Sequence, residues 1–401
     1  MKVVQINALD HSSTGKIMLG IAEVARSNGI DAYTFSSSRA AKNQGSIKHE
    51  YFDRYIDYRF HMVMGMVFGF ETDFSYMATK RLIKKLREIK PDIIHLHNTH
   101  GWYLNHPLLF NYIKKNKIKT IWTLHDCWTF TGRCPYFQIT GCNKWKSSCH
   151  DCPYDKKMYP ASYIFDRSRI QHKKKKKMFL GIKDLTIVTP SKWLAKLVEE
   201  SYLKDYPVRV INNGIDMNVF KPTESNFKEK YKLQDKKIVL GIAASWGKRK
   251  GIDVFIELAN RLNEDYQIVL VGTNDTVDKQ LPKNIISIHR TNNQQELAEI
   301  YSAADVFAIP TREDNFPTVN IEALACGTPV ITFKTGGSPE IIDERCGSVV
   351  ECNDVDAFEK EIIRICDEKP YSEEACLMRA KIYDMKDKFR EYVNMYKENK
   401  K

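Results

Sequence analysis

Residues 310–331 read PTREDNFPTVNIEALACGTPVI, and this stretch decides the fold. It predicts a buried strand that ends near Pro310, a polar loop, and a short helix that begins at Pro317 or Thr318 and ends at Gly327. A further apolar strand follows directly. Strands that alternate with helices in this way are typical of a parallel sheet with both faces covered.

The loop and the first turn of that helix carry groups suited to a diphosphate and a sugar. Unpaired backbone N–H groups and the positive end of the helix dipole attract phosphate oxygens. Glu322, one turn into the helix, and Glu313 or Asp314, in the loop, can accept hydrogen bonds from sugar hydroxyls. The same residues also fit an ordinary surface loop with acidic side chains, and local composition does not choose between the two.

A basic turn, WGKRKG at residues 246–251, lies between another apolar strand and another helix. Because ligands bind at the carboxyl ends of parallel strands, Arg249 and Lys250 are expected to face the same cleft as the helix described above. An arginine fork and a lysine point charge suit a phosphate, although a solvated basic turn has the same composition. The first loop of the chain, where Gly15 leads into a helix, is a weaker candidate of the same kind.

Length and composition limit the class of protein. A chain of 401 residues predicts two domains, and 43% apolar residues with 14 Pro and 19 Gly exclude a disordered or fibrous protein. The net charge of +12 favours anionic partners. The longest uncharged apolar stretch, residues 62–70, is far shorter than the roughly 20 residues of a spanning helix. The first residues lead into a strand rather than a secretory segment, so we expect a cytosolic protein, soluble or peripheral to a membrane.

Taken together, the motifs resemble those of retaining GT-B glycosyltransferases of family 4, in the branch that includes exopolysaccharide and lipopolysaccharide glycosyltransferases. The segments that carry the resemblance follow the family's order, and they are Ser13–Ile17, Ile94–Asn98, Leu124–Asp126, Thr131–Cys134, Thr189–Ser191, Asn212–Asp216, Arg249–Gly251, Glu313–Val330 and Gly336–Glu340. The combination is specific for the family and weakly specific for the substrate.

The resemblance implies an α/β protein of the GT-B fold, with two Rossmann-like, doubly wound domains that face each other across a cleft. An acceptor-binding domain is expected over residues 1–205, with a cysteine-rich insertion at 127–152. A nucleotide-sugar-binding domain is expected over residues 206–375. The segment 376–401 is expected to be a helix that packs back on the first domain.

The resemblance also implies roles for single residues. Glu322 matches the second acid of the family's E-x7-E motif and is expected to hold the ribose hydroxyls. The first acid falls by spacing on Asp314, a departure from the motif, and Glu313 lies one residue early, so either can meet the donor sugar. The other donor-binding residues implied are His125 at the sugar, Gly15, Arg249 and Lys250 at the diphosphate, and Asn315, Phe316, Pro317 and Thr318 around both.

The chemistry implied is transfer of a hexose-type sugar with retention of its anomeric configuration. As the anomeric C–O bond breaks, negative charge develops on the β-phosphate, where Arg249, Lys250 and the helix end can stabilise it. No catalytic metal or other cofactor is then expected, and the β-phosphate can take the acceptor's proton. The implied donor is a nucleotide sugar, UDP-linked rather than GDP-linked on family frequency. The implied acceptor is a saccharide, lipid-linked in cell-surface polysaccharide biosynthesis, which would place the enzyme on the inner face of the plasma membrane.

The cysteines form a separate pattern. Five of the ten fall within residues 127–152, and four of these have the spacing Cys134-x7-Cys142-x6-Cys149-x2-Cys152. Four thiolates can hold a structural zinc ion with no open position for catalysis. Reduced thiols that pack a loop against the domain fit the same spacing, so both interpretations stay open.

Two further segments have open interpretations. The lysine run at 173–177 predicts a solvated helix face or an attraction to anionic lipid. The segment 51–74 is rich in aromatic residues and methionine, and it predicts either a docking surface for membrane or lipid-linked acceptor, or part of the core, which we favour.

Other functions remain as alternatives. A GT-B-like nucleotide-sugar epimerase would need paired acid and base groups at the sugar, and a sugar phosphorylase would need a phosphate or cofactor-lysine site; neither set is assembled beyond Asp314, Glu322 and His125. A zinc-knuckle nucleic-acid-binding protein would use the positive charge, but the cations cluster in short loops and one helix without an RNA-binding aromatic strand motif. No nucleic-acid partner is therefore expected.

Overall fold

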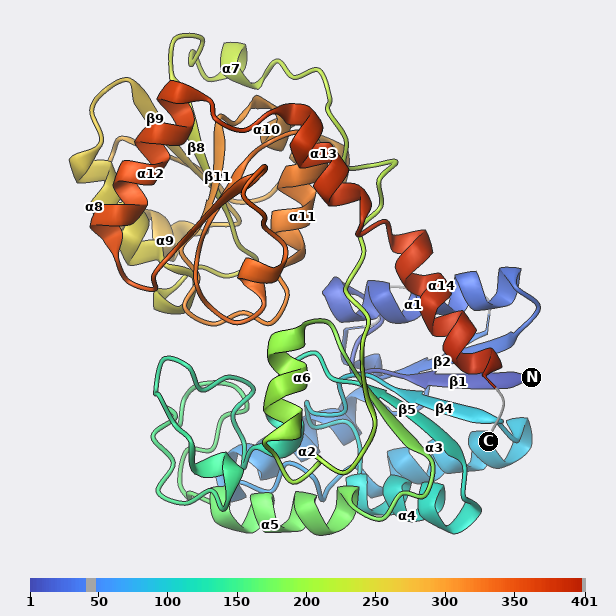
Figure 1. The fold of residues 1–401 in the computed structure, drawn as a ribbon. Helices are drawn as coiled ribbons and strands as arrows, with labels where there is room; N and C mark the ends of the chain where they lie inside the picture. Colours follow the sequence, from blue (N-terminus) through green and yellow to red (C-terminus); the bar gives the residue numbers. More distant parts are fainter. Residues whose placement is uncertain (41–47, 399–401) are drawn as a thin grey trace. The chain divides into compact units, whose positions relative to one another are not determined.

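The computed structural model describes residues 1–40 and 48–398, and the chain forms two units (Figure 1). The first holds Met1–Asn212 together with the chain from Phe389 onward, and the second holds Asn213–Lys388. The first boundary thus falls at Asn212 and not at residue 205. The expected C-terminal segment is divided, because helix α13 (Glu373–Lys381) packs on α11 (Thr318–Ala325) inside the second unit.

The sheet of the first unit is fully parallel, with the strand order β3-β2-β1-β4-β5-β6-β7. Its central strands are buried runs of apolar residues, as expected for a sheet covered on both faces. The strands are β1 (Lys2–Ile6), β2 (Asp31–Ser36), β3 (His49–Tyr51), β4 (Ile93–Leu96), β5 (Lys119–Thr123), β6 (Leu185–Thr189) and β7 (Val208–Val210).

Helices cover both faces of this sheet (Figure 1). On one face lie α1 (Ser12–Ser27) and the part of α14 (Met385–Lys397) that belongs to this unit. Phe389 of α14 packs on Gly20 of α1, where an added Cβ would lie 2.3 Å from the Phe389 ring. The other helices of the unit are α2 (Tyr55–Phe68), α3 (Tyr76–Ile89), α4 (His106–Asn116), α5 (Ser168–Phe179) and α6 (Lys192–Glu199), of which α3, α4 and α5 pack side by side on the opposite face.

An aromatic cluster joins that opposite layer to the sheet. The rings of Phe110 on α4, Trp122 on β5 and Phe179 on α5 lie 4.7 to 5.1 Å apart between centroids. All three side chains are fully buried or nearly so. Rings in contact at this spacing add to the apolar surface that the fold removes from water.

The second unit repeats this architecture with six parallel strands in the order β10-β9-β8-β11-β12-β13. The strands are β8 (Lys237–Ile242), β9 (Tyr266–Val271), β10 (Ile285–Ile288), β11 (Val306–Ile309), β12 (Val330–Phe333) and β13 (Gly347–Val350). One hydrophobic core lies under α8 (Ile252–Arg261) and α12 (Val355–Glu368), and another under α10 (Gln294–Ala303), α11 and α13. Two four-residue helices, α7 (Phe227–Lys230) and α9 (Asp275–Asp278), complete the unit.

In each sheet, the strand order reverses direction between two adjacent central strands, so the connections after these strands run to opposite sides. These pairs are β1 with β4 and β8 with β11. In open parallel sheets, ligands bind outside the carboxyl ends of the strands at such a switch point. The fold therefore indicates one candidate site in each unit.

The remaining elements are short. Residues 127–152 hold two single-turn 3-10 helices, η2 (Trp128–Phe130) and η3 (Lys144–Lys146), so this segment is an insertion without longer secondary structure. Within the two described ranges no helix combines the length and the apolar character that crossing a bilayer requires.

Candidate functional site

The loop after β11 forms one wall of the candidate site in the second unit. The helix α11 begins at Thr318 and ends at Ala325, and Gly327 follows in a left-handed conformation, as the sequence predicts. Pro317 occupies the N-cap position and has no side-chain acceptor for the first N–H groups of the helix. The positive end of α11 thus lies at the carboxyl edge of the sheet, beside the switch point.

The basic turn after β8 meets this loop. Arg249 Nη1 donates to the carbonyl oxygen of Glu313 at 2.9 Å, and the N–H of Arg312 donates to the Arg249 carbonyl at 2.9 Å. Gly251, in a left-handed conformation, lets the turn approach closely, because an added Cβ would lie 2.3 Å from the Pro310 carbonyl oxygen. Two segments 60 residues apart in the sequence therefore form one constellation at the ends of β8 and β11.

An ion pair lies at the centre of this constellation. The Lys250 ammonium contacts the Asp314 carboxylate, and both side chains are mostly buried. Glu313, Asn315 and Phe316 are almost fully buried, at 3 to 4% exposure. Asp314 thus contacts Lys250, and the adjoining Glu313 side chain is almost fully buried, so which of the two acids meets the donor sugar stays a prediction.

Glu322 is positioned by a residue that the sequence does not indicate. The hydroxyl of Tyr301, on α10, donates to Glu322 Oε2 at 3.1 Å. Burial raises the pKa of Tyr301 well above its usual value, and the adjacent Glu322 adds to the shift, so this hydroxyl stays a donor at neutral pH. A tyrosine in a helix with no motif around it gives no local signal of this role.

The candidate site of the first unit is organised by Asn7, at the end of β1. Its amide donates to the carbonyl of Leu9 at 2.8 Å and to the Thr14 hydroxyl at 3.2 Å, while its Oδ1 accepts from the N–H of Asn98 after β4 at 3.1 Å. Gly15 lies in the first turn of α1, where an added Cβ would lie 2.6 Å from the carbonyl carbon of Asp10. The loop before α1 is thus held at the switch point, and Gly15 allows its close approach.

His125 follows β5 and pairs with His97, which follows β4. Their rings stack with centroids 5.6 Å apart, and His97 Nδ1 lies 3.3 Å from His125 Nε2. The other nitrogen of His97, Nε2, lies 2.9 Å from Gln5 Oε1. With Gln5 as acceptor, the proton of His97 is on Nε2, so its Nδ1 accepts from the Nε2–H of His125.

Burial keeps these histidines neutral. It lowers the pKa of His125 to about 4, against an opposing effect of Asp126, and it lowers the pKa of His97 well below its usual value. The sequence motif at 94–98 contains His97, but its contact with His125 depends on the pairing of β4 with β5. Because its N–H is donated to His97, a neutral His125 can accept a hydrogen bond from a sugar hydroxyl at Nδ1 without adding charge.

A buried charge network lies behind these residues. Lys175 Nζ lies 3.4 Å from the centre of the Trp128 ring and donates to the Trp128 carbonyl at 2.8 Å. The Trp128 indole N–H donates to Glu71 Oε2 at 2.6 Å. Desolvation lowers the pKa of Lys175 to about 8, and Glu71 partly opposes this shift. The lysine run is therefore not a uniform solvated face, because its central residue is part of the core.

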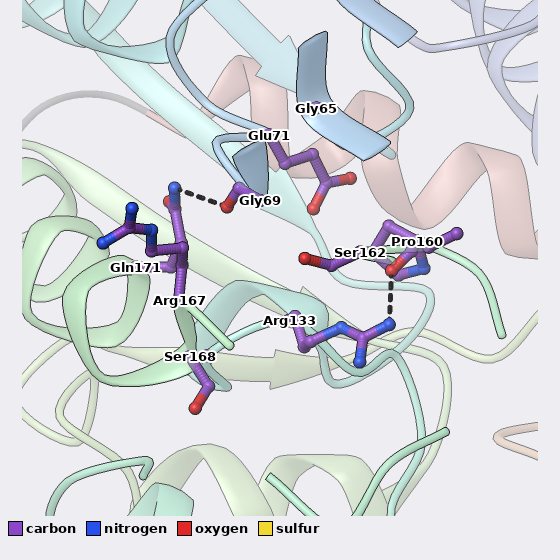
Figure 2. A pocket seen from close by; sticks show the side chains of 11 residues that line it. Gly65, Gly69, Glu71, Arg133, Pro160, Ser162, Arg167, Ser168 and Gln171 are labelled. Carbon is purple, nitrogen blue, oxygen red and sulfur yellow. Dashed lines mark hydrogen bonds between the residues drawn. The ribbon is translucent and has the colours of Figure 1, made fainter. Parts of the chain in front are cut away.

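A small cavity adjoins this network (Figure 2). Glu71, Arg133, Ser168 and neighbouring residues line it. Arg133 Nη2 donates to the Pro160 carbonyl at 2.8 Å, and further bonds from Arg133 to backbone carbonyls hold the loop that follows the cysteines. Arg133 thus holds the loop of residues 154–160 in place.

The four cysteines of the predicted zinc site line one pocket. They are Cys134, Cys142, Cys149 and Cys152, and all are free thiols. Burial first, and neighbouring thiols second, raise the pKa of Cys134 to about 12. Among the described residues, the one group of three or more metal-binding side chains with ligand atoms all within 4.8 Å is Asp275, Asp278 and His289. The sulfurs are gathered but do not stand at coordination distance, and the zinc site stays a prediction.

The two parallel-sheet units define a GT-B fold, the class to which many sugar-transferring enzymes belong. The family model described as "Glycosyltransferase Family 4" matches residues 18–219, half of the chain. The family model described as "Glycosyl transferases group 1" matches residues 223–381. The chain belongs to glycosyltransferase family 4.

Similar proteins agree with this assignment. The chain is 27% identical over 286 residues to the putative colanic acid biosynthesis glycosyl transferase WcaC of Escherichia coli K12. The matched region covers 67% of this chain and 66% of that protein. It is 27% identical over 190 residues to the UDP-Gal:alpha-D-GlcNAc-diphosphoundecaprenol alpha-1,3-galactosyltransferase of Escherichia coli, covering 43% of this chain and 48% of the relative. The chain thus spans about two thirds of the length of the first relative and about half of the length of the second. Anabaena Alr3699/HepE, solved in complex with UDP, has a TM-score of 0.68 at 13% identity, with 99% of both chains covered.

Proposed function

We propose that this protein is a retaining glycosyltransferase that moves a hexose-type sugar from a nucleotide sugar to a saccharide acceptor in cell-surface polysaccharide biosynthesis. One observation carries the proposal. Arg249, Lys250, Asp314 and the N-terminus of α11 converge at the switch point of the second unit, in a chain of glycosyltransferase family 4. Cations and a helix end at that place suit a diphosphate.

In this proposal the donor spans the loop and helix after β11. Arg249, Lys250 and the N–H groups of Asn315, Phe316 and Thr318 bind the diphosphate. Glu322, oriented by Tyr301, accepts from the ribose hydroxyls. The diphosphate competes with Asp314 for Lys250, which frees the Asp314 carboxylate to meet a hydroxyl of the donor sugar. Glu313 remains buried and supports the loop through its carbonyl bond with Arg249.

The reaction breaks the bond between the anomeric carbon and the β-phosphate oxygen. Negative charge then grows on the phosphate, where the fixed cations stabilise it more than in the ground state. The acceptor hydroxyl attacks on the leaving-group face and forms the new C–O bond, and its proton passes to the β-phosphate oxygen. Neutral His125 accepts from a sugar hydroxyl at Nδ1 and adds no positive charge beside the developing oxocarbenium ion. We propose that these groups suffice without a metal ion.

The relatives support a finer assignment of substrates. One is named for a UDP-galactose donor and a diphosphoundecaprenol acceptor, one for colanic acid biosynthesis, and a structural neighbour was solved with UDP. We therefore propose a UDP-sugar donor rather than a GDP-sugar, and a lipid-linked saccharide acceptor. Such an acceptor places the enzyme at the inner face of the plasma membrane.

A panel of nucleotide sugars tests the proposed function. The protein is incubated with UDP-, GDP- and ADP-sugars, with and without lipid-linked or soluble saccharide acceptors. We expect nucleotide release that rises with acceptor, and the product linkage read by NMR should keep the donor's anomeric configuration. An isomerised donor without transfer would indicate an epimerase, and inversion would refute the retaining mechanism.

We also propose that Cys134, Cys142, Cys149 and Cys152 bind one structural zinc ion after a small closure of their pocket. Their gathering around one space, with no disulfide among them, supports this. Metal analysis of protein purified without added chelator should give about one equivalent of zinc. A Cys142→Ser/Cys152→Ser variant should lose it, whereas Cys352→Ser, at an exposed cysteine of the second unit, should not. Less than about 0.2 equivalents in the unaltered protein would refute the site.

A further inference from the structure

The helix α2 has an apolar face that the rest of the first unit leaves uncovered. Only His61 and Gly65 of its 14 residues are buried. At 100° per residue, Tyr55, Ile56, Phe60 and Val63 fall on the opposite side of the helix, and they are exposed by 50 to 72%. The structure thus corrects the expectation that this segment belongs to the core.

The exposed apolar residues continue beyond α2. The N–H of Tyr163 donates to the Met66 carbonyl of α2 at 2.9 Å, which fixes the loop of residues 163–165 against the helix. Phe60 packs edge-on against Phe74, in the segment that leads into α3, at 6.0 Å. The exposed apolar side chains of this neighbourhood are Tyr55, Ile56, Phe60, Val63, Phe68, Tyr76, Met77, Tyr163, Ile164, Phe165 and Ile170.

Exposed basic side chains lie on the same helices and on the neighbouring helix α5. The exposed side of α5 carries Arg169, Lys173, Lys176 and Lys177, whose helical positions share one arc, and Arg54, Arg59 and Lys80 lie on α2 and α3 or next to them. α5 adjoins the end of α2, because Gln171 Nε2 donates to the Gly69 carbonyl at 3.2 Å. We name the two sets together the apolar–basic surface.

Most acids near this surface are paired or buried, and exposed Asp166 accepts from the backbone N–H groups of Cys152 and Ser168. Asp57 contacts Arg81, and Asp73 contacts Lys174. Glu71 is buried against Trp128. The charge that the surface presents to solvent is therefore positive.

We propose that the apolar–basic surface docks this protein on an anionic lipid bilayer. The apolar side chains enter the boundary between headgroups and acyl chains, and the lysines and arginines contact the negative headgroups. The inference rests on the proposed function in one respect, since it places the first unit at the membrane where a lipid-linked acceptor resides. Vesicle binding itself needs neither donor nor acceptor.

Charge decides between the possible occupants. A second copy of the chain packed on this face through a two-fold axis would place each lysine and arginine against the same positive surface of its partner. A lipid surface instead offers negative charge at its border and an apolar layer beneath, which matches both sets of side chains. The bilayer is therefore the occupant that the observed side chains fit.

Sedimentation with vesicles tests the proposal. The protein is mixed at about 50 mM salt with two kinds of vesicle. One is pure phosphatidylcholine, and the other is phosphatidylcholine with about 40% phosphatidylglycerol. We expect binding only to the anionic vesicles, and its loss near 500 mM salt, where the screening length is short. Absence of binding at low salt would overturn the proposal.

Two variants separate the contributions. Lys173→Gln/Lys176→Gln/Lys177→Gln should weaken binding by about a hundredfold. Ile56→Ser/Phe60→Ser/Val63→Ser should weaken it by at least about tenfold and leave a salt-sensitive remainder. The matched control is Val349→Ser/Met378→Ser/Ile382→Ser, which removes three exposed apolar side chains from the second unit and should bind like the unaltered protein.

Other results would contradict the lipid assignment. Equal weakening by the control would show that exposed apolar area in general causes sedimentation. Sedimentation equilibrium without vesicles should show no self-association through the α2 residues. If the unaltered protein self-associates and the α2 variant does not, a second copy of the chain is the occupant. UDP binding of each variant, measured without lipid, should be unchanged, so a failure of docking is distinguished from a failure of the donor site.

Discussion

The two units have the same strand order around their switch points, yet they place different chemistry there. The second unit presents Arg249 and Lys250, which are charged, whereas the first presents His97 and His125, which burial keeps neutral. Ten of the eleven histidines lie in the first unit, and only His289 lies in the second. The topology indicates where each unit binds a ligand, and the residue types decide the chemistry: cations suit a phosphate, and neutral hydrogen-bonding groups suit a sugar.

The largest expected effect is a different acid sensitivity of the two units. Burial lowers the pKa of His61, His95 and His106 to about 3 and that of His125 to about 4. Between those values and the unfolded value near 6.5, the unfolded state binds more protons, so stability is present above pH 6.5 and is lost as pH falls. At pH 5 each such histidine costs about 2 kcal/mol, and four can offset most of a domain's stability.

Hydrogen exchange of peptides from each unit, at pH 7.5 and pH 5, checks this expectation. The first unit should lose protection at pH 5, whereas the second should change little, because the pKa of exposed His289 is raised by Asp278. His106→Phe is the sharpest variant, since neither ring nitrogen of His106 has a hydrogen-bond partner in the described structure. It should retain stability at pH 7.5 and reduce the acid sensitivity by about 2 kcal/mol. Equal loss of protection in both units would contradict the contrast.

The second expected effect concerns the cations of the second unit. Arg249→Ala/Lys250→Ala should lower the transfer rate by roughly 10³-fold or more, because each group stabilises charge that develops in the transition state. Lys248→Ala removes an exposed cation from the same turn and should change the rate little. Initial rates with a UDP-sugar and acceptor measure the effect. If the double variant keeps its rate, the diphosphate does not bind at the ends of β8 and β11.

The third effect separates two neighbours in the lysine run. Lys175→Met removes the cation that most favours the charged form of buried Glu71. It should destabilise the first unit by about 3 kcal/mol, since the buried acid loses its compensating charge. Lys176→Met, at an exposed position, should change stability by less than about 0.5 kcal/mol. Thermal unfolding followed by tryptophan fluorescence reports mainly on the first unit, which holds five of the six tryptophans. The double variant Lys175→Met/Glu71→Gln should recover part of the loss, and equal effects of both single changes would refute a buried role.

The parts predicted from sequence were those with a local signal. The central strands have such a signal because each is a buried apolar run, and α11 has one because Pro317 and Gly327 bound it. The edge strands β3, β7 and β13 are three or four residues long and partly exposed, so they have no such run. Likewise, Arg249 and Asp314 lie in two separate segments of the sequence. Each segment follows a strand, and the rule that ligands bind at the carboxyl ends of parallel strands predicts that the two residues lie close together.

The missed features depend on partners far away in the chain. Lys175 is indistinguishable from its neighbours until Trp128 and Glu71 are placed around it. The apolar side of α2 has the composition of a core helix, and periodicity does not show which side is covered. A sequence pattern reports what an element offers, whereas the packing of other elements decides whether it becomes core, site or surface.

The smallest expected effect tests one such distant partner, Tyr301. Tyr301→Phe removes the hydroxyl that orients Glu322 and leaves the buried ring in place. Since one hydrogen bond to a charged group contributes about 1.5 kcal/mol, we expect the KM for the UDP-sugar to rise roughly tenfold with a smaller change in kcat. Tyr266→Phe removes a hydroxyl that contacts Asp367 on the surface of the same unit and should leave KM unchanged. A change in melting temperature alone, without a change in KM, would mean that Tyr301 supports the fold but does not position Glu322 for the donor.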